Sequence, residues 1–74
     1  MPGQYNNLYD EIACHIAEVQ VQPVGTHIVF ADDPAGVFRW DGGIWRDLKD
    51  NKVTISVDSM AQFMTFEKGS WAFL

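Results

Sequence analysis

The sequence predicts a single α+β domain, in which an N-terminal amphipathic helix packs on an antiparallel β-meander of four to five strands. Two observations carry this prediction. Apolar side chains recur at helical spacing near the N-terminus, and stretches rich in β-branched and aromatic residues then follow, separated by Gly, Pro and Asp turns. The length of 74 residues allows one domain, 1–74. A sheet with this element order can also curl toward a small barrel.

Residues 5–21 are expected to form the helix, with Asn6 or Asn7 as its N-cap and Pro23 and Gly25 beyond its end. At about 100° per residue its apolar side chains fall within one arc. Acidic residues gather opposite, and His15 lies on the flank of the arc. The arc consists of Tyr5, Leu8, Tyr9, Ile12, Ile16 and Val19, and the opposite face of Asn7, Asp10, Glu11, Cys14 and Glu18.

The strand signals begin after this helix. Residues 58–67 stay open between a short helix, begun by a capping box at 59–62, and a further strand. The apolar terminus 71–74 is expected to dock on the domain or meet a partner. The expected strands and turns are strand 26–31, a type I turn at 33–36, a hairpin over 37–48 around Asp41-Gly42-Gly43, and strand 53–57.

Loop length decides which side chains share a face of the sheet, because neighbours along a strand alternate between faces. A two-residue turn at 50–51 pairs Leu48 with Val53. Both hairpins then agree on one apolar face if the loop at 41–43 has three residues. This register turns Phe38 and Trp40 inward with Arg46, and it sets Arg39 opposite Trp45 on the outer face.

An even-length loop, such as Gly42-Gly43, is the alternative, and it would place Phe38, Trp40 and Trp45 on one face. With the preferred odd loop, the outer face is half apolar and carries a tryptophan, which is typical of an interface. The opposing interpretation is that Trp71 and Phe73 fold back over it. The outer face consists of Val37, Arg39, Trp45, Asp47, Thr54 and Ser56, to which strand 26–31 adds either Ile28 and Phe30 or His27, Val29 and Ala31.

The net charge of −5 is unevenly distributed. Residues 1–38 carry acidic side chains and no Lys or Arg, whereas residues 39–74 are balanced. Nucleic-acid backbones require clustered positive charge, so direct nucleic-acid binding is disfavoured. The apolar runs fall far short of the ~20 residues that span a bilayer. The lone Cys14 and the absence of a signal-peptide pattern predict a cytoplasmic location.

Side chains that could carry chemistry are few and poorly spaced. The soft metal ligands are Cys14, His15 and His27, and the first two diverge on a helix, so no metal site is expected. Cys14 lies on an acidic helix face, which disfavours a thiolate nucleophile. The phosphate-binding glycine motifs are absent. The sequence therefore predicts neither an enzyme nor a cofactor.

These observations predict a small acidic non-enzymatic protein that binds other proteins, itself included as a homodimer or larger assembly. Interaction or inhibitor-type proteins of this kind occur among the accessory proteins of phages and other mobile elements. The alternative is a module for a small ligand or carbohydrate with an exposed Trp/Arg platform. The expected binding residues are Arg39, Trp45, Val37, Thr54 and Phe30.

Overall fold

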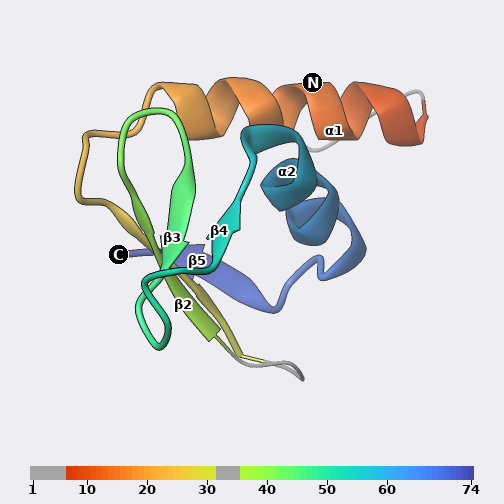
Figure 1. The fold of residues 1–74 in the computed structure, drawn as a ribbon. Helices are drawn as coiled ribbons and strands as arrows, with labels where there is room; N and C mark the ends of the chain where they lie inside the picture. Colours follow the sequence, from red (N-terminus) through yellow and green to blue (C-terminus); the bar gives the residue numbers. More distant parts are fainter. Residues whose placement is uncertain (1–6, 32–35) are drawn as a thin grey trace.

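The computed structural model describes residues 7–31 and 36–74, in which two helices lie on one face of a five-stranded antiparallel sheet (Figure 1). The strand order β4-β3-β2-β1-β5 is a meander to which β5 returns beside β1. The predicted α+β class is therefore confirmed. The elements are α1 (Leu8–Gln20), β1 (His27–Phe30), β2 (Gly36–Trp40), β3 (Trp45–Asp47), β4 (Thr54–Ile55), α2 (Val57–Phe66) and β5 (Trp71–Phe73).

Helix α1 begins after Asn7, one of the two predicted N-caps, since the Asn7 side chain accepts a hydrogen bond of 2.9 Å from the Asp10 backbone N–H. Its buried stripe differs from the predicted arc. Glu11 and His15 are buried together with Val19, whereas Tyr9 is 82% exposed. The prediction for Tyr9 was wrong because the helix face toward the sheet carries a polar cluster, which a hydropathy pattern assigns to solvent. Tyr5 and Asn6 lie outside the described residues.

The hairpin between β2 and β3 has the even-length loop that the sequence left as its alternative. Trp40 pairs with Trp45 and Arg39 with Arg46, while the Asp41 N–H donates a 3.0 Å hydrogen bond to the Ile44 carbonyl. Gly42 adopts a φ of 94°, a conformation that glycine enters freely. The predicted three-residue loop is therefore wrong, and Trp45 shares a face with Trp40.

The loop between β3 and β4 explains this error. Instead of a two-residue turn at 50–51, residues 48–52 bridge the strands, and Arg46 pairs with Thr54. Two aspartate side chains accept hydrogen bonds from backbone N–H groups two residues further on, Asp47 from Lys49 at 2.8 Å and Asp50 from Lys52 at 3.0 Å. The register shifts by one residue, which moves every side chain of β3 to the other face relative to β4.

Of residues 58–67, left open by the sequence, 58–66 belong to helix α2 and Glu67 is its C-cap. The helix starts earlier than the predicted capping box, because Ser56 is the N-cap and its hydroxyl accepts a 3.1 Å hydrogen bond from the Ser59 N–H. Strand β4 is correspondingly shorter than the predicted strand 53–57. The apolar terminus forms β5 beside β1. Of the expected turn at 33–36, residues 33–35 lie outside the described residues.

The core is centred on Trp45, which has no exposed surface. Its ring lies 5.2 Å from that of Trp40 and stacks on Phe73, with 6.4 Å between centroids and 13° between planes. Strands β3 and β5 are separated by β2 and β1, and neighbouring strands lie about 4.8 Å apart. Contact between their rings therefore requires the sheet to curl. No pairing between β4 and β5 closes a barrel in the described residues.

We predict that Trp45→Ala unfolds the protein. Emptying this site costs about 3–5 kcal/mol, which equals the whole stability of about 3–5 kcal/mol typical of so small a core. Trp45→Phe should cost less, because the buried Trp45 Nε1 has no hydrogen-bond partner to lose in the described residues. Circular dichroism with urea titration measures both effects. A folded Trp45→Ala variant would contradict the observed register.

Candidate protein-binding surface

The five residues expected to bind a partner fall on two different faces of the sheet. Val37, Arg39 and Thr54 share the open face, which neither helix covers in the described residues. Trp45 and Phe30 belong to the core, with 0% and 6% of their surfaces exposed. A platform of Trp45 beside Arg39 therefore does not form, and the prediction of an exposed Trp45 was wrong.

The open face is dominated by an ion cluster around Asp41. The Asp41 carboxylate lies 2.9 Å from Arg46 Nε and 3.7 Å from Arg39 Nη1. Arg46, which the sequence placed on the inner face, also donates a 2.8 Å hydrogen bond to the Asn51 carbonyl and so ties two loops together. The cluster neutralises much of the positive charge on this face. The open face also carries two half-buried apolar side chains, Val29 and Val37, which pair across β1 and β2.

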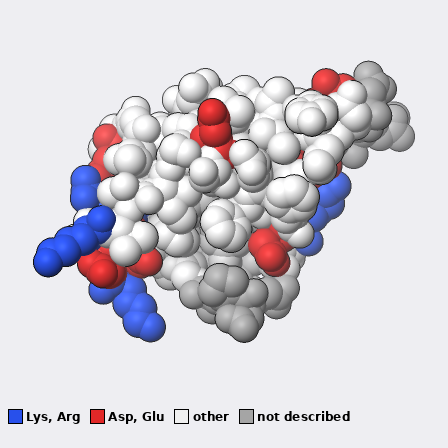
Figure 2. All heavy atoms as spheres, turned by 45° about the vertical axis from the view of Figure 1, so that its right-hand side comes forward, with Lys and Arg blue, Asp and Glu red and all other residues white. Residues whose placement is uncertain are grey.

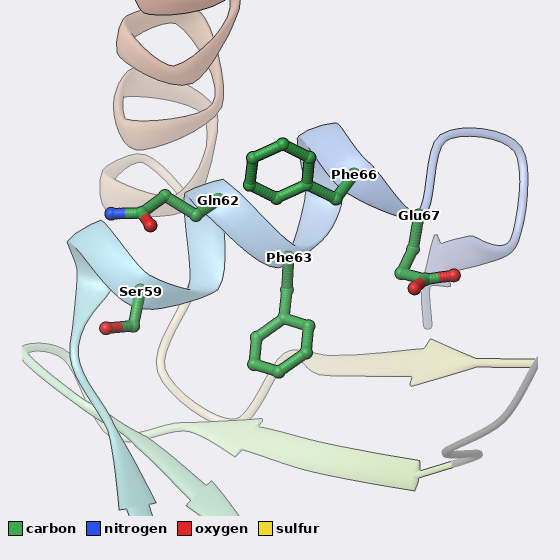
Figure 3. A pocket seen from close by; sticks show the side chains of 5 residues that line it. All are labelled: Ser59, Gln62, Phe63, Phe66 and Glu67. Carbon is green, nitrogen blue, oxygen red and sulfur yellow. The ribbon is translucent and has the colours of Figure 1, made fainter.

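A more strongly apolar surface lies on α2 and escaped the sequence interpretation. Phe63 is 42% exposed and Phe66 is 66% exposed, and both line a shallow hollow of about 290 Å³. In Figure 3, Phe63 points from α2 toward the sheet, and Phe66 lies along the outer side of the helix. We call this the α2 surface, and it consists of Ser59, Gln62, Phe63, Phe66 and Glu67.

The packing of α2 explains why these phenylalanines remain at the surface. Met60 and Met64 fill the core, so the neighbouring turn positions face outward. Phe63 stands at the boundary, because its ring makes an edge contact at 6.0 Å with buried Phe30. The sequence grouped Phe63 with both methionines as one helical face. The one residue in the sequence that could have indicated the α2 surface was Phe66, which lies off that helical face.

The charges around the α2 surface are sparse. Figure 2 brings forward the side of the molecule on which α2 lies, and it shows a broad uncharged area with isolated acidic side chains. Lys and Arg side chains gather toward the margins of this view. Glu67 forms part of the lining of the hollow. The surface is therefore apolar with an acidic edge.

A polar cluster fixes α1 to the chain that follows α2. Lys68 Nζ lies 2.9 Å from the buried Glu11 carboxylate, and His15 Nδ1 lies 2.7 Å from Glu18 Oε1. The His15 ring also makes an edge contact at 5.6 Å with Trp71. A carboxylate as buried as that of Glu11 needs such a partner to offset its lost hydration. The cluster therefore serves to seat α1 against the start of β5.

Trp71 closes the C-terminal end of α2. Its Nε1–H donates a 2.8 Å hydrogen bond to the Met64 carbonyl, in the last turn of the helix. Such carbonyls lack intrahelical partners and need others. The hydrogen bond thus joins the frame of the α2 surface to β5.

The residues considered for chemistry are not brought together. Cys14 is free and exposed, whereas the neighbouring His15 is buried and lies against Glu18 and Trp71. In residues 7–31 and 36–74, no three His, Cys, Asp or Glu side chains are grouped so that they could hold a metal ion. The same residues include no helix with the length and apolar character needed to cross a membrane.

Comparisons with known proteins found no relative of this chain. No family model matches the chain, and no curated protein or solved structure matches it significantly.

We predict that Trp71→Phe lowers the free energy of unfolding by about 1 kcal/mol, because it removes the hydrogen bond to the Met64 carbonyl and keeps an aromatic ring. The midpoint of urea denaturation measures the loss, and amide exchange should rise in the last turn of α2. An unchanged midpoint would show that this hydrogen bond contributes nothing to stability.

Proposed function

We propose that this protein is a non-enzymatic protein-binding protein that takes its partner on the α2 surface. The observation that supports this most is the pair Phe63 and Phe66, exposed beside one hollow. Aromatic anchors in a pocket with a polar rim are the usual hot spots of protein interfaces. Binding removes their apolar area from water, at roughly 25 cal/mol per Å² before the cost of association.

The partner that fits this surface presents an apolar side chain flanked by Lys or Arg. The apolar side chain enters the hollow between the two phenylalanines, and the cation lies near Glu67. The net charge of −5 attracts such a partner over distances of about 10 Å at 0.1 M salt. We place this interaction in the cytoplasm, where an exposed free thiol such as Cys14 persists.

Phe66→Ser tests the proposal. Because Phe66 is largely exposed, we expect stability to change by no more than about 0.5 kcal/mol. Partner binding should weaken by about 2 kcal/mol, roughly thirtyfold, as for truncation of a hot-spot aromatic. Immobilised wild type and variant are each used to capture proteins from the native cytoplasm. Quantitative mass spectrometry then identifies the proteins that the wild type captures and Phe66→Ser does not.

Thr54→Ala is the matched control, because Thr54 is exposed on the open face of the sheet, opposite to the face on which α2 packs. Proteins captured by wild type and by Thr54→Ala, but not by Phe66→Ser, are the expected result. Raised salt should slow their association, since the attraction between opposite charges is screened. Equal capture by all three chains would refute the α2 surface as the binding site.

A further inference from the structure

We propose that a second copy of this chain pairs along the free edge of β5 and extends the sheet across a two-fold axis. This interface is separate from the α2 surface and independent of the proposed function. The direction of the backbone groups of β5, the chemistry of this edge and the pattern of its side chains all favour it.

The hydrogen bonds to β1 show which backbone groups of β5 face outward. The Ser70 carbonyl accepts from the Ala31 N–H at 2.7 Å, and Leu74 and His27 exchange hydrogen bonds of 2.8 and 3.1 Å. In an antiparallel ladder the bonded residues alternate. The N–H and C=O groups of Trp71 and Phe73 therefore point away from β1, toward the free edge. In the described part of the chain they have no backbone partner.

The two edges of the sheet differ in their chemistry. Residues 70–74, Ser-Trp-Ala-Phe-Leu, contain no charged side chain and no proline. The opposite edge, β4, has only two residues, and it runs directly into the N-cap of α2 at Ser56. Native proteins protect edges by shortening them or by charging them. Strand β5 is also short, at three residues, but none of its side chains is charged, although the chain carries a net charge of −5.

The side chains of β5 are complementary to themselves. If two copies align antiparallel with Ala72 on the two-fold axis, Trp71 of each copy lies opposite Phe73 of the other. The outward groups of both pairs then exchange hydrogen bonds in both directions. Trp71 and Phe73 lie on the helix side, so each pair brings aromatic rings together. Ala72 is exposed on the open face, where its small side chain permits close approach at the axis.

The edge is also rigid before pairing, which lowers the entropic cost of association. Trp71 is fixed by its hydrogen bond to the Met64 carbonyl and by its contact with His15. Phe73 is stacked on the buried Trp45. A self-complementary, uncharged and immobile edge favours a second copy over a strand of unrelated sequence. Since the edge strand is short, we expect a weak dimer whose population rises with concentration.

Ala72→Lys tests this interface by sedimentation over a concentration series. The substitution sets two ammonium groups directly opposite each other at the axis, so the dimer dissociation constant should rise roughly fivefold or more. Ala72→Ser is the control and should dimerise as wild type does. Position 72 is exposed in the monomer, so the circular dichroism of both variants should match that of the wild type. A monomeric wild type, or equal dimerisation of all three chains, overturns the proposal.

A cross-link tests the register independently. At a pair of this kind, about 4.5 Å separates the two Cα atoms, a distance that a disulfide spans. In a Cys14→Ser background, which removes the exposed native thiol, Ala72→Cys should give a disulfide-linked dimer under mild oxidation. Thr54→Cys in the same background, on the opposite edge, should remain monomeric. Failure of the first to cross-link, or equal cross-linking of both, overturns pairing about Ala72.

Discussion

The structure depends on the burial of Trp45 between Trp40 and Phe73. This contact joins strands that are not neighbours in the sheet, so it holds the sheet in its curled form. A chain of this size buries only roughly 60% of its unfolded surface. One large aromatic side chain therefore contributes a large share of the apolar area buried in the core. Among the described residues the Trp45 Nε1–H has no hydrogen-bond partner, a cost that the packing of the ring must offset.

Burial of Trp45 also decides where binding can occur. With Trp45 facing the helices, the open face of the sheet is left with arginines that share one carboxylate, Asp41. Two aromatic side chains, Phe63 and Phe66, remain accessible on α2 instead. The same inward stacking holds Phe73, and with it the edge strand β5. The register that buries Trp45 thus affects both surfaces. It leaves the exposed phenylalanines on α2, and it holds Phe73 in the edge strand β5.

Partly buried contacts connect these two regions. Glu11 pairs with Lys68 beyond α2, and Trp71 links His15 of α1 to the Met64 carbonyl at the end of α2. These contacts span the sequence from the first helix to the last strand. They explain why a helix stripe that contains a carboxylate and an imidazole faces inward. They also hold β5 in place through its side chains and leave its free edge unpaired.

The α+β class, an N-cap at Asn6 or Asn7 and a turn at Gly42-Gly43 as one of two options could be predicted from the sequence. These features follow from local propensities and alternation, which neighbouring residues specify. The face of Trp45, the inward Glu11 and the exposed Phe66 depend on tertiary contacts. The Asp47 and Asp50 carboxylates accept hydrogen bonds from backbone N–H groups in a loop that is one residue longer than predicted, and a shift of one residue turns the side chains of a strand to the other face. Lys68 and Trp71, distant in sequence, supplied the partners that made a polar helix face the buried one.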